Sequence, residues 1–585
     1  MKNTKILLKD FKNLKKIWPY LKPWRFRLLL ALSLVPIIIV VNTAVPWILK
    51  ETIDNGIAKN SHSAIVTGSL IYLILIISEY FFRGAQTLLL NTSVHKMIKS
   101  LRTALIQNIL ELAPAFHDRT LSGALVTRAT SDFDNMSESL NQGILSSIID
   151  LAVVLGTLFG LFILNPYICL SVILILPFVG SIVIFFSTTL KKTMLTARKK
   201  IAVLNAFIQE CPLGKATIKI LTAENVAAVE VGGKAKDYRN AQMKSVILDA
   251  FMFAILDGVA SITIGLTLWV AVSPHINLNQ YSNITPGILV ATIAYIGNLF
   301  DPLKQLSNKI AMLQGTFTAI DRIFSILEEQ DFISGDESIC EIEGDIEFDS
   351  VSFSYSTAKP NTQIIDDLSF HVESKSSLAI VGPTGSGKST IIKLITKMYQ
   401  GFEGEILLDK KSIANISPRA LRKKIGIVPQ DIILFQGSIS FNISLGMANI
   451  SEDDIKNACK LVGADTFISQ LPGKYQFQIS EQGSNLSQGE RQLISFARAL
   501  AKKPSLIILD EATSSVDPNS EARIQKAIES ILEERTVIII AHRLSTIKNC
   551  DKILVLEAGK ISQIGSHDDL ISSKGTYQTL ASHLN

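Results

Sequence analysis

The glycine-rich stretch Gly382-Pro383-Thr384-Gly385-Ser386-Gly387-Lys388-Ser389-Thr390 fits the pattern G-x-x-x-x-G-K-[ST] and decides the fold of the C-terminal half. The apolar run Leu378–Val381 before it is short enough for a buried strand, and Ile391–Ile395 after it has the pattern of a helix. In this setting, glycines let backbone N–H groups surround phosphate oxygens, and the start of the helix adds a favourable dipole. The stretch therefore predicts a nucleotide site rather than an empty glycine turn, with Lys388 on the β- and γ-phosphates and Ser389 on Mg²⁺.

Composition indicates a membrane protein of several domains. The chain has 585 residues, more than one core holds, and 48% of them are hydrophobic. Only 19% are charged, below the ~25% of soluble domains, and the mean hydropathy is +0.32. The net charge of +5 is mild, and the basic residues lie beside apolar runs, so we expect no nucleic-acid partner. The five cysteines are far apart and form no CxxC, which gives no sign of a disulfide framework or a zinc site.

Six apolar runs in the first 310 residues are each close to the ~20 residues with which a helix crosses a bilayer. We place them near Leu28–Leu49, Ala64–Phe82, Ile144–Leu164, Tyr167–Phe186, Ala250–Val272 and Gly287–Leu306.

The loops between these spans predict their orientation. The loop between spans four and five carries eleven Lys or Arg from Lys191 to Lys244, and the long loop between spans two and three is also basic. The loop Ser273–Pro286, between spans five and six, has neither Lys nor Arg. By the positive-inside rule, the N-terminus and both long loops are cytoplasmic, in a plasma (inner) membrane. Residues 1–27, with nine Lys or Arg and interleaved aromatics, are expected to form an amphipathic segment at the membrane surface.

Both long loops have a helical pattern, so we expect spans two to five to continue as helices into the cytoplasm. Four acidic residues fall within or near spans, where an ionisable group usually faces the bundle interior or a wet cavity. For Asp150 and Asp257, a substrate path and a structural contact between helices are equally supported. For Glu79 and Asp301, the structural contact is favoured.

The helical pattern ends near Leu327, and an acidic, polar linker is predicted over residues 328–343. From Gly344 the sequence has short β-rich runs and glycine turns. The predicted domains are therefore an N-terminal segment 1–27, a six-helix transmembrane domain 28–327, the linker, and an α/β P-loop domain 344–585.

Other residues of this last domain fit phosphate chemistry. Asp510 ends the apolar run Leu506–Leu509 and is expected to hold Mg²⁺ through water, and Glu511 is placed to polarise the attacking water. Gln430 is a further candidate for the Mg²⁺ shell, and Tyr355 for stacking on adenine. His542 follows the strand-like run Thr536–Ala541, where an imidazole would contact the γ-phosphate at the carboxyl end of a strand.

A further element, Leu486-Ser487-Gln488-Gly489-Glu490, lies between Gln430 and Leu506 and precedes a helical run. The whole series resembles the ATP-binding cassette of ABC transporters. In chain order it consists of Tyr355, the glycine-rich stretch, Gln430, Leu486–Glu490, Leu506–Glu511, Asp517 and His542. The membrane half is similar to the six-helix ABC exporter fold. Within this family the chain looks most like bacterial multidrug half-transporters of the MdlB type.

The resemblance implies an ATPase that uses ATP and Mg²⁺ and pairs with a second half-transporter. Each ATP would lie between one chain's glycine-rich stretch and the other chain's signature, here Ser487 to Glu490. The cytoplasmic loops would dock on the cassettes, with Phe116–Gly123 and Asn205–Gly214 as candidate docking segments.

One departure concerns the signature, which is most often LSGGQ in this family, whereas Gln488 and Glu490 stand here at its third and fifth positions. The other motifs are intact, which favours a heterodimer whose partner supplies a complete signature, with a homodimer as the alternative. The leading hypothesis is an ATP-driven exporter of amphipathic compounds, and membrane lipids are expected as further partners. The alternatives are a flippase for a lipid or lipid-linked glycan and, in another class, an ATP-switched channel or regulator, which Glu511 and His542 disfavour.

Overall fold

The computed structural model describes residues 15–272, 285–329, 331–338, 342–355, 363–510, 518–532, 535–540 and 544–583. The contacts among them divide the chain into two units. The N-terminal unit runs to Leu110 and resumes with Ser122–Glu329. The C-terminal unit joins Glu111–Leu121 to the described residues after Glu329. A short segment between two spans thus belongs, by its contacts, with the C-terminal unit.

The N-terminal unit is helical. Among the described residues, six helices are long and apolar enough to cross a membrane, as the sequence predicted. Its helices are η1 (Lys22–Trp24), α2 (Arg25–Thr52), η2 (Ile53–Ile57), α3 (His62–Glu111), α5 (Ser122–Ala129), α6 (Ser131–Ser139), η3 (Leu140–Leu145), α7 (Ser146–Leu164), α8 (Pro166–Leu213), α9 (Lys215–Ile220), α10 (Glu224–Val272) and α11 (Pro286–Leu327).

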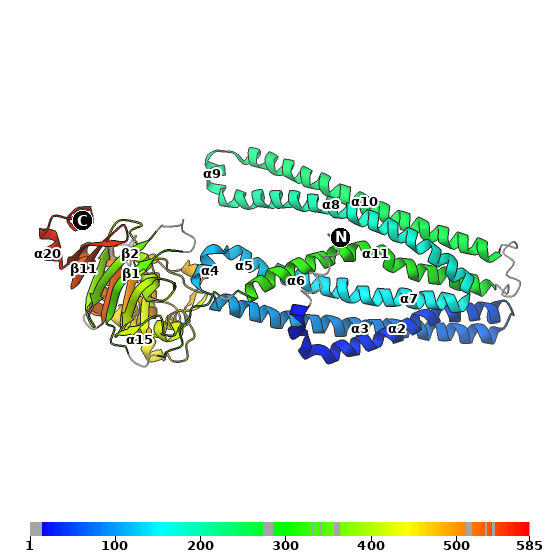
Figure 1. Ribbon diagram of the computed structural model, residues 1–585, viewed down its shortest axis with the longest axis horizontal. Helices are drawn as coiled ribbons and strands as arrows, with labels where there is room; N and C mark the ends of the chain where they lie inside the picture. Colours follow the sequence, from blue (N-terminus) through cyan, green and yellow to red (C-terminus); the bar gives the residue numbers. More distant parts are fainter. Residues whose placement is uncertain are drawn as a thin grey trace. The chain divides into compact units, whose positions relative to one another are not determined.

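Three helices are far longer than a bilayer requires. Helices α3, α8 and α10 have 50, 48 and 49 residues, and at ~1.5 Å per residue they exceed the ~30 Å hydrocarbon core more than twofold. The prediction that the spans continue as helices through the long loops is confirmed. Helices α8 and α10 lie side by side along their length (Figure 1).

The tight connection between α7 and α8 is built by one capping residue. The Asn165 side chain accepts hydrogen bonds from the backbone N–H groups of Tyr167 (2.9 Å) and Ile168 (3.2 Å). Pro166 takes the first helical position, where its missing N–H costs nothing.

The structure differs from the expectation for the second long loop. Residues 205–213 are the last turns of α8, and the short connecting helix is α9, immediately after them. Helix α8 is capped by Gly214, which donates its N–H to the carbonyl of Glu210 (2.8 Å). The predicted docking segment Asn205–Gly214 therefore precedes the turn of this hairpin, because the helix continues through Pro212 to Leu213.

The basic N-terminal segment is described only from Lys15, and residues 15–21 are helical. Ile17 is buried, Lys16 forms an ion pair with Glu328 (2.7 Å), and the Lys96 ammonium lies 4.7 Å from the ring centre of Trp24. The described part of the segment thus contacts α3 and the C-terminal end of α11. The rest of the predicted amphipathic segment lies outside the described residues.

The C-terminal unit contains a six-stranded sheet of order β12-β11-β3-β10-β9-β6 and an antiparallel sheet of order β2-β1-β4-β5. A short β7–β8 pair also occurs among the described residues. Their bounds are β1 (Ile346–Phe353), β2 (Ile365–Val372), β3 (Ser377–Val381), β4 (Glu403–Leu408), β5 (Lys411–Ser412), β6 (Ile425–Val428), β7 (Gly437–Ser438), β8 (Gln478–Ile479), β9 (Leu506–Asp510), β10 (Thr536–Ile540), β11 (Lys552–Glu557) and β12 (Lys560–Gly565).

The larger sheet is covered on both faces, which explains its continuous apolar strands. In β9, Ile507 and Leu509 enter one apolar cluster, while Leu506 and Ile508 enter the other. The helices of this unit are α4 (Pro114–Arg119), α12 (Lys388–Ile395), α13 (Pro418–Lys424), α14 (Ile439–Ser444), α15 (Glu452–Leu461), α16 (Asp465–Ile468), η4 (Lys474–Gln476), η5 (Glu481–Gly483), α17 (Gln488–Ala501), α18 (Pro518–Leu532), α19 (Leu544–Ile547), α20 (His567–Ser572) and α21 (Thr576–His583).

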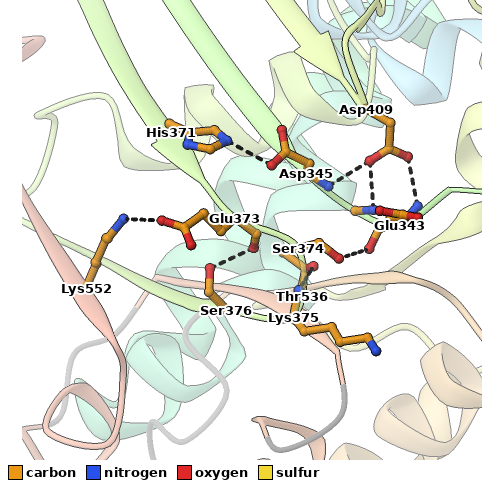
Figure 2. A network of polar contacts seen from close by, with 11 residues as sticks. Glu343, Asp345, His371, Glu373, Ser374, Lys375, Ser376, Asp409, Thr536 and Lys552 are labelled. Atoms are coloured by element: carbon orange, nitrogen blue, oxygen red, sulfur yellow. Dashed lines mark hydrogen bonds and ion pairs between the residues drawn. The ribbon is translucent and has the colours of Figure 1, made fainter.

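The backbone just before β1 is held by hydrogen bonds to one carboxylate (Figure 2). The Asp409 carboxylate accepts hydrogen bonds from the backbone N–H groups of Glu343, Gly344 and Asp345 at 2.8–3.0 Å. The Asp345 carboxylate in turn contacts His371 Nε2 (2.8 Å). These contacts fix the backbone where the sequence changes composition. The domain boundary at Gly344 stays our proposal.

Candidate functional site

The glycine-rich stretch forms a turn between the buried strand β3 and helix α12. Gly382, Gly385 and Gly387 have φ values of +155°, +83° and +106°, which L side chains rarely adopt. A Cβ at Gly382 would lie 2.2 Å from the carbonyl oxygen of Leu556, and Gly387 is the left-handed residue just before α12. The glycines therefore allow the tight turn that joins β3 to α12.

Two polar side chains of this turn fit an oxyanion. The Ser386 side chain is buried, and its Oγ has no hydrogen-bond partner among the described residues. The largely buried Lys388 ammonium donates hydrogen bonds to the carbonyls of Gly382 (2.7 Å) and Pro383 (2.9 Å), so it folds back over the turn. A buried hydroxyl that lacks a partner and a cation beside it are groups that phosphate oxygens satisfy. The turn therefore fits the phosphates of a nucleotide.

The remaining residues of the turn divide by exposure. Pro383, Thr384 and Ser389 are exposed, and Thr390 is buried on the first turn of α12. The Thr390 hydroxyl lies 3.1 Å from the hydroxyl of Tyr355, which follows β1. The predicted base-stacking residue thus lies against the helix that begins the phosphate turn.

The predicted Mg²⁺ residues lie at the same edge of the sheet as the phosphate turn. Strands β3, β10, β9 and β6 are parallel neighbours, so their carboxyl ends meet at one edge. Gly382 follows β3, Asp510 ends β9 beside Ile540 of β10, and Gln430 lies two residues beyond β6. This is the edge at which ligands bind in open α/β sheets. Glu511, Asp517 and His542 lie outside the described residues, so their roles stay predictions.

The signature begins helix α17 with a reciprocal cap. Ser487 Oγ accepts a hydrogen bond from the N–H of Glu490 (3.2 Å), and Glu490 Oε2 accepts one from the N–H of Ser487 (2.8 Å). Gln488 is the first residue of the helix, and Gly489 is buried. This capping box was not predicted from the sequence, although the pattern Ser-x-x-Glu before an apolar run is its known signal.

The four acidic residues of the spans all have ion-pair partners. Asp150 on α7 pairs with the nearly buried Lys309 on α11. Asp257 and Asp301 share Lys304, at 2.6 Å and 3.2 Å, and Glu79 pairs with Arg83 at 2.9 Å. The structural alternative for Asp150 and Asp257 therefore has a concrete contact between helices. A role in transport stays a prediction for both.

The N-terminal unit also contains a cavity of about 1150 Å³ between α3, α6, η3, α7 and α11. Its wall includes His95 Nδ1 at 3.4 Å from Ser137 Oγ, and an ion pair between Arg102 and Asp134 (3.0 Å). Lys309 also lines it, whereas Asp150 and Asp257 are absent from its described wall. The cavity is far larger than a water site and has both polar and apolar walls. Sequence periodicity could not indicate it, because it forms between helices that are distant in the chain.

Helix α4 packs on the rest of the C-terminal unit, to which its contacts assign it. The N–H of Ala113 donates to the carbonyl of Asp331 (2.8 Å), and Arg119 pairs with the Asp331 carboxylate (3.1 Å). Ala115 packs on the apolar cluster that is formed by residues of both the antiparallel and the six-stranded sheet. The helix overlaps the predicted docking segment Phe116–Gly123 but begins two residues earlier, at Pro114.

Comparisons with known proteins give the family. Residues 28–303 match the ABC transporter transmembrane region, and residues 365–514 match the ABC transporter domain. A probable multidrug resistance ABC transporter ATP-binding/permease protein of Bacillus subtilis, YheH, is 32% identical over 86% of this chain and 74% of its own length. The chain belongs to the ABC transporter family.

This ABC transporter is similar over its whole length to two further proteins. The ATP-dependent lipid A-core flippase of Desulfotalea psychrophila is 29% identical over 97% of this chain and 98% of its own. The structure of a bacterial Atm1-family ABC exporter with ATP bound superposes with a TM-score of 0.79 at 26% identity, covering 96% of this chain and 98% of that one. The predicted fold is therefore confirmed, and the cassette is an ATP-binding domain that couples ATP hydrolysis to transport across the membrane.

Proposed function

We propose that this chain is one half of a dimeric exporter that uses ATP hydrolysis to move amphipathic compounds out of the cytoplasm or the inner leaflet. The observation that carries the proposal is the phosphate turn. Its buried, unpartnered Ser386 hydroxyl and folded-back Lys388 lie in the same chain as six membrane-crossing helices. The cavity of the N-terminal unit, with its polar and apolar walls, supports a cargo that has both kinds of surface.

In this proposal, the edge of the parallel sheet supplies the residues for hydrolysis. Lys388 and the N–H groups of the turn bind the phosphates, and Ser389, Gln430 and Asp510 hold Mg²⁺. The ion, when bound, would neutralise part of the charge that develops on the phosphates. Glu511 orients and polarises water, and His542 contacts the γ-phosphate. Tyr355 stacks on adenine.

The partner is a second half-transporter, since exporters of this fold function as dimers. We favour a heterodimer, because Glu490 places a carboxylate at the start of α17, where the family signature faces the partner's ATP. A homodimer is the alternative. In either dimer, each chain would cross the plasma (inner) membrane several times, with its N-terminus and its cassette in the cytoplasm.

A flippase for a lipid or lipid-linked glycan is the second candidate. It is favoured by one observation, the full-length similarity to a protein named a lipid A-core flippase. In both cases the energy source is the same, and only the cargo differs.

The experiment that separates these functions is a stimulation assay. The protein, purified with any half-transporter that copurifies and placed in lipid bilayers, is given Mg²⁺–ATP with a panel of amphipathic drugs, and separately with a panel of lipids and lipid-linked glycans. Stimulation of phosphate release by drugs is expected. Stimulation by lipids alone would replace the exporter with the flippase, and stimulation by neither panel would contradict both.

A further inference from the structure

Three aromatic rings of the cassette pack edge to face. Tyr355 lies 4.9 Å from Tyr399, with the ring planes at 85°, and 5.1 Å from Phe353, with the planes at 82°. Phe353 and Tyr399 are buried, and Tyr355 is half-buried. In this geometry the positive edge of one ring faces the negative face of the next, which fixes the rings relative to each other.

One side of this cluster is joined to the phosphate turn. The Tyr355 hydroxyl lies 3.1 Å from Thr390 Oγ1, on the first turn of α12. One turn later, the Lys393 ammonium lies 5.5 Å from the ring centre of Tyr355 and 5.6 Å from that of Tyr399. The rings are therefore anchored to the helix that holds Lys388 and Ser389.

The other side is joined to the docked loop. The Tyr399 hydroxyl donates a hydrogen bond to the Asp118 carboxylate, on α4. In the sequence, α4 lies between the helices of the second and third membrane spans. Asp331 holds the two ends of this segment, through the N–H of Ala113 and the guanidinium of Arg119. Tyr399 is thus in direct contact both with the predicted base-stacking ring and with the loop between two spans.

We propose that Tyr399 is a positioning residue that couples the nucleotide base on Tyr355 to Asp118 of the docked loop. The proposal rests on the base-stacking role of Tyr355 in the proposed function. A base on Tyr355 restricts that ring, and through its edge-to-face contact it restricts Tyr399 and the hydrogen bond to Asp118. Because coupling between sites is reciprocal, docking of the loop also favours the base-bound position of Tyr355.

The test uses the full-length protein in lipid bilayers and a conservative variant. Tyr399→Phe keeps the ring packed on Tyr355 but removes the hydroxyl that binds Asp118. We expect the stimulation of ATP hydrolysis by the panel of amphipathic drugs to fall by about fivefold or more, which is the lower end of typical coupling between sites. The melting temperature should stay unchanged. Hydrolysis of UTP, whose smaller base covers less of the ring, should change less than that of ATP.

Tyr475→Phe is a matched control. Its hydroxyl also donates to an aspartate of the same unit, Asp465 (2.7 Å), but touches neither the aromatic cluster nor the docked loop. This variant should keep the cargo stimulation of the wild type. An equal loss in both variants would assign the effect to general destabilisation and overturn the proposal.

A second variant covers the case in which Tyr399→Phe folds poorly. Asp118→Ala removes the acceptor from the other side, and in the double variant the loss should be no larger than in either single one, because one contact is removed in all three. Additive losses, or a stimulation within twofold of the wild type in the single variants, would overturn the proposal.

The base-stacking role is tested separately: Tyr355→Ala should weaken binding of ATP but not of inorganic triphosphate. Equal effects on the two ligands would contradict that role alone.

Discussion

The backbone N–H of Ser487 donates a hydrogen bond to Oε2 of Glu490 over 2.8 Å. In the signature expected from the family resemblance, this carboxylate would lie near the partner's ATP. The structure instead turns it back onto the start of its own helix, where a negative charge is favourable. A phosphate that approaches this helix start must therefore compete with a carboxylate that is already bound there.

Glu490→Gln tests this competition. The amide oxygen still accepts from Ser487, but the charge is lost, so the ATP held by the partner chain should be capped better. We expect faster ATP hydrolysis by the assembled dimer, measured as phosphate release. Asp569→Asn is the control, because the hydroxyl of Ser566, the N-cap of α20, donates a hydrogen bond to the Asp569 carboxylate (2.6 Å) away from the signature. An unchanged rate in Glu490→Gln would contradict the proposed effect of the carboxylate.

Lys388→Ala and Glu511→Gln should separate binding from hydrolysis. Removing the Lys388 ammonium loses a charged hydrogen bond to phosphate, about 1.5–3 kcal/mol or roughly 10- to 150-fold in Kd. Glu511→Gln should keep nucleotide binding and lose about 10²–10⁴-fold in turnover, as expected for a general base. A fluorescent nucleotide reports the first quantity and phosphate release the second. Near-normal turnover in Glu511→Gln would reject the role assigned to that residue.

The ion pair of Asp150 and Lys309 lets a structural role be distinguished from transport. Asp150→Asn leaves Lys309, which is 8% exposed, without its charged partner and should lower the melting temperature. The double variant Asp150→Leu/Lys309→Met should recover most of that loss. If the Asp150 carboxylate also contacts cargo, transport of cationic amphiphiles stays impaired in the double variant.

The matched control is Asp257→Asn. Its carboxylate is 63% exposed in the pair with Lys304, so the loss of stability should be below about 1 kcal/mol. Unchanged transport in the stable variants of both sites would leave only the structural role.

Cysteine labelling tests the orientation of the spans. Cysteines placed at Ser100 and Lys199 should react only from the cytoplasm, and one at Ser282 only from outside, because the basic loops are retained inside. Burial raises the pKa of Cys459 and Cys550 to about 12, so these thiols should stay unlabelled near neutral pH. Cys169 is also buried, so the background needs replacement of Cys211, which is half-buried, and of Cys340, which lies outside the described residues. Labelling of Ser282→Cys from the cytoplasm alone would overturn the six-span orientation.

Much of this architecture could be predicted from the sequence, since local patterns determine it. Apolar runs of membrane length predicted the six spans, and the fixed spacing of the glycines before Lys388 predicted the phosphate turn. The capping box of Glu490 was also readable from its spacing but was missed. By contrast, the contact of Tyr399 with Asp118 joins residues 281 positions apart, and no local pattern indicates it. The ion pair of Asp150 and Lys309 also depends on how helices pack.

Sided transport is the most direct test of the central claim, that ATP hydrolysis by this chain moves an amphipathic cargo. Inside-out membrane vesicles containing the chain, with any half-transporter that copurifies, are given Mg²⁺–ATP and a fluorescent amphipathic compound. We predict ATP-dependent accumulation of the compound inside wild-type vesicles and none in Glu511→Gln vesicles that still bind nucleotide. Equal accumulation in the two preparations, across a panel of amphipathic compounds, would contradict the account.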